Sequence, residues 1–260
     1  MGMFIAYPGT YAPIESEHAT ISNPTSQASP DGLAANLVTR SGSVLGPDWV
    51  AGDTDSTIEC DITFGTPISP GYVVIVASNL SAAASVKLYR GPVAGPRTLV
   101  ATLGKCSPAN VWIAVMNGIS PSAKFSLTIV DNVATLPLQI PYLRMGARVA
   151  LDGLYRERRD PELVDLSTHT GGQLGSSMSC EQRTQFKMVF PLKGTTASFF
   201  NLRLAFEAVK TVRPLVVCFD DADPTAYGNT IVGLLQSIPV QKTDPGMLVS
   251  VDMVVNELIA

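Results

Sequence analysis

Apolar and polar residues alternate most clearly between residues 56 and 91. In the first strand of this stretch, polar residues alternate with Ile58, Cys60, Ile62 and Phe64. This period of two predicts a strand with one buried face. The run 72–77 is apolar at every position, which predicts an inner strand covered on both faces. Alternation returns in 85–90, so the stretch predicts three strands of a packed β-sandwich.

Further strands follow in the same half of the chain. Apolar runs bounded by Gly, Pro, Asn or Ser occur at 97–103, 111–116 and 125–130. Trp112 lies inside one of these runs, which favours a core position over a sugar-stacking platform. Trp49 and Val50 predict a short strand that faces the core. We therefore expect a jelly-roll-like β-sandwich over residues 21–140.

Residues 1–20 predict an extended N-terminal arm. Pro8 and Pro13 interrupt any helix or ladder there, whereas Tyr7 and Tyr11 supply apolar anchors. Such an arm can lie on a neighbouring subunit or on a second domain, or it can be a loose terminus. Tyr7 and Tyr11 are therefore candidate interface residues.

The second half of the chain, 141–260, predicts an antiparallel β domain with one α-helix. The helix is expected over about 196–210, where apolar residues at helical spacing form one stripe, namely Phe199, Leu202, Phe206 and Val209. Strands are expected on both sides of it, at 142–151, 185–190, 215–219, 230–238 and 247–258. The predicted fold class is therefore mainly β, a sandwich followed by a β-rich domain across which the helix lies.

Composition restricts the function classes. Charged residues make up only 15% of the chain and hydrophobic residues 46%, so either neighbouring subunits cover much of the surface, or Ser, Thr and Asn dominate it. The net charge of −4 argues against a nucleic-acid footprint, which would be basic. The sequence shows no signal peptide and no apolar run long enough for a membrane span. Folding in a cytoplasm is the expectation.

Residues suited to catalysis or metal binding are sparse and scattered. The four cysteines (Cys60, Cys106, Cys180 and Cys218) form no Cys-x-x-Cys pair, which favours free thiols over a zinc site. His18 and His169 lie in no catalytic motif, and Ser176 and Ser177 near His169 lack a recognisable triad. Asp220, Asp221 and Asp223 could offer oxygen ligands to calcium, but acidic residues before Pro are also ordinary turn formers. We expect no enzyme, no cofactor and no metal.

A dense charge run follows the expected strand at 142–151. Arg156, Arg158 and Arg159 lie among acidic residues, and arginine is suited to forked contacts with carboxylates of a partner. A solvated connecting loop explains the same run. The three arginines are candidate interface residues.

Several strand patterns resemble a known family. Five segments are together similar to jelly-roll proteins of the tailed-bacteriophage tail tip. They are a strand ending at Phe64-Gly65, the segment Asn79-Leu80-Ser81, the run from Arg144 to Val149, the Gly171-Gly172 pair and a terminal strand ending at Glu257-Leu258. The resemblance covers roughly residues 20–260. It implies a virion structural protein, a distal-tail or baseplate component that assembles in the host cytoplasm. It also implies a ring-forming homo-oligomer, a trimer or hexamer, in contact with other tail proteins.

The alternative is a carbohydrate-binding adsorption module that recognises host surface glycans. Jelly rolls often bind sugars in their end loops, but the loops 66–71, 79–84 and 91–96 are dominated by Pro, Gly, Ala and Ser. They lack the aromatic and charged side chains that sugar stacking and forked hydrogen bonds require.

Overall fold

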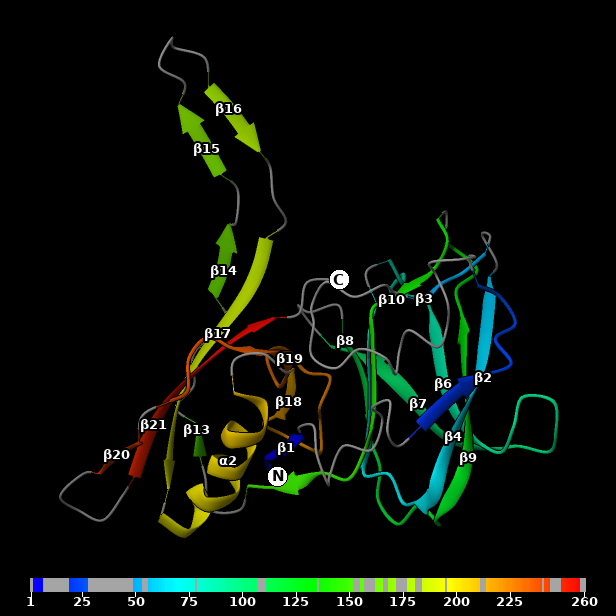
Figure 1. Cartoon of the computed structure of the whole chain (residues 1–260), viewed down its shortest axis with the longest axis horizontal. Coiled ribbons are helices and arrows are strands. Elements are labelled where there is room, and N and C mark those ends of the chain that lie inside the picture. The colour runs from blue at the N-terminus through cyan, green and yellow to red at the C-terminus, as the bar shows by residue number, and fades with distance from the viewer. Residues whose placement is uncertain are drawn as a thin grey trace.

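The fold was obtained as a computed structural model. It describes residues 2–6, 19–27, 49–52, 56–77, 79–106, 111–134, 136–151, 155–156, 162–165, 168–171, 177–180, 184–194, 196–210, 214–239, 241–243 and 249–257. The described chain is mainly β and contains two large antiparallel sheets and the helix α2 (Thr196–Val209), as the sequence predicted (Figure 1). Side chains of 155–190 are not described.

The first large sheet curls into the predicted sandwich. Its strands are, in spatial order, β11 (Tyr142–Gly146), β5 (Tyr72–Val76), β8 (Val111–Val115), β7 (Thr98–Lys105), β6 (Ser85–Arg90), β9 (Ser122–Val130), β4 (Thr57–Ile68) and β2 (Ala19–Ser22). Strand β7 pairs with β6 along one part and with β8 at Gly104 and Lys105, so it belongs to both halves of the sandwich. A small sheet of β3 (Trp49–Val50) and β10 (Gln139–Ile140) adds to this unit.

The sandwich core contains the residues that the alternating sequence pattern predicted to be buried. Ile58, Cys60, Ile62 and Phe64 of β4 are buried in it, together with Trp49 and Trp112. The indole N–H of Trp49 donates to the Ser26 carbonyl at 3.0 Å. Strands with one apolar face were therefore assigned correctly, because burial on one side imposes the period of two.

The second large sheet carries α2. Its main path runs through β12 (Val149–Ala150), β1 (Phe4–Ala6), β18 (Leu215–Cys218), β19 (Thr230–Leu235), β21 (Val249–Glu257), β17 (Thr184–Gly194) and β13 (Tyr155–Arg156). Off this path, β14 (Glu162–Asp165) pairs with β17, and β20 (Gln241–Thr243) pairs with β21. Beyond β14, the hairpin β15 (Thr168–Gly171) and β16 (Ser177–Cys180) projects from the body of the molecule (Figure 1).

Helix α2 packs on one face of this second sheet. Its predicted apolar stripe is buried against β-strand residues that include Leu215, Val217 and Met253. The helix ends at Val209, and Lys210 follows it with φ of 50° while its N–H donates to the Phe206 carbonyl at 2.8 Å. Lys210 therefore follows the last turn and caps the helix in a left-handed conformation.

A third apolar cluster joins the two units. It contains side chains of β5, β8, β11 and the residue after β7 from the sandwich, and of β1, β18 and β19 from the second sheet. Its members are Phe4, Ala6, Tyr72, Val74, Val76, Cys106, Val111, Ile113, Tyr142, Val216, Cys218 and Val232. Strand β5 thus turns Val73 and Ile75 into the sandwich core and its other side chains toward the second sheet. This explains the unbroken apolar run at 72–77, predicted as a strand covered on both faces.

The path of the chain differs from the division expected at residues 20 and 140. Residues 4–6 of the expected arm form β1 inside the second sheet, between β12 and β18, and Ala19–Ser22 already belongs to the sandwich. The expected strand 142–151 is two strands, β11 in the sandwich and β12 in the second sheet. The sandwich is therefore inserted between β1 and the rest of the second unit. A three-residue strand beside prolines gives too little periodicity to be recognised in a sequence.

Candidate functional site

The outer side of α2 carries an exposed apolar surface. Phe200 is 62% exposed and Leu204 is 38% exposed, and the two lie four residues apart on the side of the helix away from the sheet. Between and beside them, Arg203 Nε donates to Glu207 Oε1 at 2.9 Å, and both of these side chains are solvent-exposed. We call Phe200, Arg203, Leu204 and Glu207 the α2 outer face.

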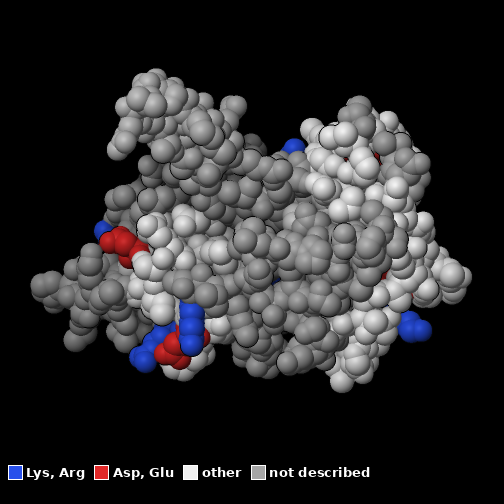
Figure 2. Space-filling view, turned by 45° about the horizontal axis from the view of Figure 1, so that its top comes forward, with Lys and Arg blue, Asp and Glu red and all other residues white. Residues whose placement is uncertain are grey.

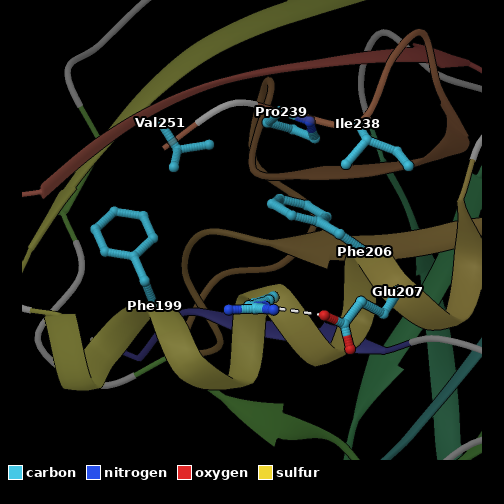
Figure 3. Close-up of a pocket in the computed structure, with 7 residues that line it drawn as sticks. Phe199, Phe206, Glu207, Ile238, Pro239 and Val251 are labelled. Atoms are coloured by element: carbon cyan, nitrogen blue, oxygen red, sulfur yellow. Dashed lines mark hydrogen bonds and ion pairs between the residues drawn. The ribbon is translucent and has the colours of Figure 1, made fainter. Parts of the chain in front are cut away.

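A pocket of about 230 Å³ adjoins this face. It lies between α2 and the segment after β19, and is lined by Phe199, Arg203, Phe206, Glu207, Ile238, Pro239 and Val251. Figure 3 shows Phe199 and Phe206 pointing from the helix toward Val251, Pro239 and Ile238, with the ion pair at one side. Ile238 is 55% exposed, so the apolar surface continues across the pocket. The lining is suited to apolar side chains, with one charge of each sign at its margin.

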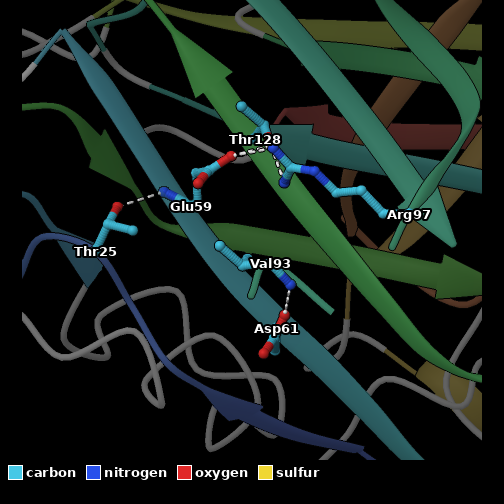
Figure 4. Close-up of polar contacts among 6 residues, drawn as sticks. All are labelled: Thr25, Glu59, Asp61, Val93, Arg97 and Thr128. Carbon is cyan, nitrogen blue, oxygen red and sulfur yellow. Dashed lines mark hydrogen bonds and ion pairs between the residues drawn. The ribbon is translucent and has the colours of Figure 1, made fainter. Parts of the chain in front are cut away.

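A polar cluster lies on the outer face of the sandwich, with members on strands β4, β6 and β9 and one residue just before β7. Glu59 Oε1 accepts hydrogen bonds from Arg97 Nη2 at 2.9 Å and from Thr128 Oγ1 at 2.7 Å, and Arg97 Nη1 donates to Thr128 Oγ1 at 3.2 Å (Figure 4). The Arg97 guanidinium also lies 4.4 Å from the centre of the Tyr89 ring, in a cation–π contact. Arg97, Glu59 and Tyr89 are each only partly buried. They form an aromatic and charged group that the loop compositions had not indicated.

Asp61 lies on the same face but has a fixed structural role. It is buried and accepts from the Val93 N–H at 2.7 Å and from Asn23 Nδ2 at 2.8 Å. The contact with Val93, shown in Figure 4, attaches the 92–96 loop to the sheet, and the contact with Asn23 attaches the segment after β2. Both carboxylate oxygens accept a hydrogen bond, which compensates the cost of burying the charge.

The acidic segment 220–223 is bound to the joint between the two units. Asp221 accepts from the Gly2 N–H at 2.8 Å and from Arg148 Nη1 at 3.1 Å. Asp220 accepts from the Ala222 N–H, and Asp223 from Thr225 Oγ1. The three carboxylates therefore contact separate partners, as expected for a turn. Among the described residues no group of three His, Cys, Asp or Glu side chains is arranged to hold a metal ion.

Two cysteines lie in the cluster between the units. Burial raises the pKa of Cys106 to about 12 and that of Cys218 to about 11, although the neighbouring Thr230 hydroxyl acts to lower both pKa values. Burial also raises the pKa of Cys60 in the sandwich core. These three cysteines are buried free thiols, as predicted, and they behave as small apolar side chains.

The candidate interface residues from the sequence fall mostly outside the described part of the chain. The residues outside the described part are Tyr7, Tyr11, Arg158 and Arg159, and also His18 and Ser176. Arg156 is in β13, His169 in β15 and Ser177 in β16, where only the backbone is described. Their proposed contacts stay predictions.

The sequence reasoning missed two features of the site, the α2 outer face and the Arg97 cluster. The first could have been noticed, because Phe200 and Leu204 share a helix side opposite the predicted stripe. The second depends on residues brought together by the pairing of β4 with β9 and of β6 with both β9 and β7, which a sequence does not specify.

Few of the described residues on the face shown in Figure 2 are charged. The described Lys, Arg, Asp and Glu residues form small separate groups there, and the rest of the described surface is uncharged. None of the helices in the described part combines the length and apolarity that a bilayer span needs.

Comparison with known proteins assigns no family. No protein-family model and no curated protein matches the chain. Among solved structures, reduced XRCC1 bound to the DNA pol beta catalytic domain matches with a TM-score of 0.40 and 16% identity, over 50% of this chain and 96% of that one. A family 32 carbohydrate-binding module from Streptococcus pneumoniae EndoD matches with a TM-score of 0.42 and 14% identity, over 52% and 99%. The family 32 module of C. perfringens NanJ, in complex with galactose, gives 0.42 and 17%, over 52% and 97%. These values are too low to assign a function to this chain.

Proposed function

We propose that the chain is a structural component of a tailed-phage virion, a distal-tail or baseplate protein that connects other tail proteins through its surfaces. The strand motifs from Phe64-Gly65 to Glu257-Leu258 that resemble tail-tip jelly-roll proteins suggest this class. None of the three solved structures named above is a tail protein, so the proposal depends on this resemblance and on the joint between the units.

The joint is the observation that supports the proposal most. The chain passes between the units twice, after β1 and after β11, and the third apolar cluster fills the space between the sheets. Polar contacts reinforce it, because the buried Arg144 donates to the Pro214 carbonyl at 2.9 Å and Arg148 pairs with Asp221. Two connections and a shared core hold the units in one orientation. A protein that transmits force between partners needs such fixed geometry.

The joint also changes the argument from composition. One explanation of the low charge fraction was that neighbouring subunits cover much of the surface, but twelve buried apolar residues fill the third cluster within one chain. Low charge alone therefore gives weaker support to assembly than the sequence indicated. The exposed apolar α2 outer face supports it independently.

The test is to locate the protein in particles. We expect antibodies against the full chain to label the tail tip of virions produced by the genome that encodes it. We also expect the purified chain to form a trimer or hexamer, visible as a ring by negative-stain microscopy. Particles without label, together with a chain that stays monomeric at high concentration, would contradict the proposal.

A second candidate function is glycan recognition by the sandwich. The partly exposed cluster of Tyr89, Arg97 and Glu59 favours it, because an aromatic ring beside charged hydrogen-bonding groups is suited to sugar rings and hydroxyls. We expect the full chain to bind a defined set of glycans on an array, and Arg97→Ala to abolish that binding. Arg203→Ala, on the exposed side of α2, is the matched control. Signal retained in Arg97→Ala, or no bound glycan at all, counts against this function.

A further inference from the structure

The α2 outer face has the composition of a contact surface. A surface helix normally turns polar residues to solvent, but α2 exposes Phe200 and Leu204 opposite its buried stripe. Ile238 extends this exposed apolar area on the far side of the pocket. A helix that is apolar on two opposite sides is typical of one that is covered on both.

The charge pattern of the α2 outer face is complementary to the same pattern on a second copy of the chain. Arg203 and Glu207 lie four residues apart, one turn of the helix, on the same exposed side. If two copies of α2 are laid side by side and antiparallel, Arg203 of each copy lies opposite Glu207 of the other. A parallel arrangement instead places like charges opposite each other, which is unfavourable.

We propose that the α2 outer face binds the same face of a second copy of this chain, with the two helices antiparallel across a two-fold axis. A two-fold contact uses one patch twice and so requires a self-complementary surface, which Phe200, Arg203, Leu204 and Glu207 provide. The contact covers Phe200 and Leu204 and exchanges both ion pairs between the copies. The apolar pocket beside the helix receives side chains at the edge of the contact. This inference does not depend on the tail role or on a ring.

Two single substitutions test the charge arrangement. Arg203→Glu gives the face two negative charges, and Glu207→Arg gives it two positive charges. Each variant should self-associate at least roughly tenfold more weakly than the wild-type chain, because both symmetric contacts become repulsive. An equimolar mixture of the two variants should associate again, because each copy then offers the opposite charge. Sedimentation velocity over a concentration series measures the association.

Phe200→Ser tests the apolar part of the contact. Phe200 is mostly exposed in the single chain, so the substitution should leave the melting temperature of the monomer unchanged while it weakens association. Leu99→Ser, an exposed apolar residue on β7 of the sandwich, is the matched control and should associate like wild type.

Each outcome decides the proposal. Restored association in the mixture, with both single variants impaired, supports the antiparallel contact and excludes misfolding as the cause. Three results would each overturn the proposal: a wild-type chain that forms no two-fold dimer, single variants that associate as strongly as wild type, or a mixture of the two variants that does not associate. If the chain also forms a ring through other surfaces, the single variants should lose only the two-fold step and keep the ring. Failure of this contact is therefore distinguishable from failure of the tail role.

Discussion

Replacing Phe4 by alanine is the most direct test of the joint between the two units. Phe4 lies in β1 of the second sheet, is 2% exposed and belongs to the third apolar cluster. The centre of the Phe4 ring is 5.9 Å from that of Tyr72 in the sandwich. The Arg148 guanidinium lies 5.7 Å from the centre of the Phe4 ring. The substitution removes these contacts between units but leaves the backbone hydrogen bonds of β1 in place.

The expected cost follows from this burial. Truncating a buried phenylalanine to alanine destabilises a protein by about 3–5 kcal/mol. Phe4 is almost fully enclosed and also loses an aromatic pair worth about 0.5–1.5 kcal/mol beyond its area. We expect the free energy of unfolding to fall by about 4 kcal/mol. For a chain of this size, each kcal/mol lowers the melting temperature by roughly 2–4 °C, so the shift should be roughly 8–16 °C.

Differential scanning calorimetry is the assay. Because the third cluster couples the sheets, the wild-type chain should unfold in one cooperative transition, and Phe4→Ala should separate it into two. Val133→Ala is the control, since Val133 is 64% exposed and its loss should change stability by less than about 0.5 kcal/mol.

A double-mutant cycle then isolates the contact across the joint. Phe4→Ala and Tyr72→Ala should be non-additive by about 1 kcal/mol, because the two rings contact each other. Two independent transitions in the wild-type chain, or additive effects of the two substitutions, would refute the idea that the units form one body.

Three further predictions concern other parts of the fold. Asp131→Asn should lower the free energy of unfolding by about 1.5–3 kcal/mol, because the Asp131 carboxylate accepts hydrogen bonds from the Ser81 N–H, the Ser81 Oγ and the Val133 N–H. Burial alone would raise the pKa of Asp131, but these hydrogen bonds hold it below the ordinary value, so the stabilisation is present above about pH 4 and lost in acid. In pH-dependent denaturation, the Asn variant should therefore lose less stability in acid than the wild-type chain. The free energy of unfolding should fall as the pH rises above about 9, because the thiols of Cys106 and Cys218 ionise at a lower pH in the unfolded chain than in the folded one. Cys106→Ala should make this free energy depend less steeply on pH, as measured by guanidinium denaturation between pH 8 and 11. Calcium should not raise the melting temperature, because the carboxylates in 220–223 contact separate partners; a rise would indicate a site.

The strands with one buried face could be predicted from the sequence because their pattern is local. Ile58 to Phe64 and Val251 to Val255 each alternate over several residues, and all of their inward positions are buried. The helix was predictable for the same reason, with a period of 3.6. Burial imposes these patterns wherever one side faces a core.

The joint and the polar cluster depend on long-range pairing and could not be predicted in the same way. The apolar run 72–77 indicated cover on both faces but not what provides it, and nothing near Phe4 indicates β18 as a neighbour. The pairing of β4 with β9 places Glu59 opposite Thr128, and Arg97, just before β7, reaches both because β6 pairs with β9 and with β7. Register and sheet order are properties of the whole fold, so local composition carries little information about them.

The position of β1 has a consequence for biosynthesis. Phe4 pairs with Ala150 of β12 and with Cys218 of β18, so β1 has no hydrogen-bonding neighbour in its own sheet until the sandwich has been translated. The described strands of the sandwich lie between residues 19 and 146, so this unit can mature earlier. Completion of the second sheet, which pairs β1 with strands that follow the sandwich in the chain, should therefore be the late and slow event of maturation.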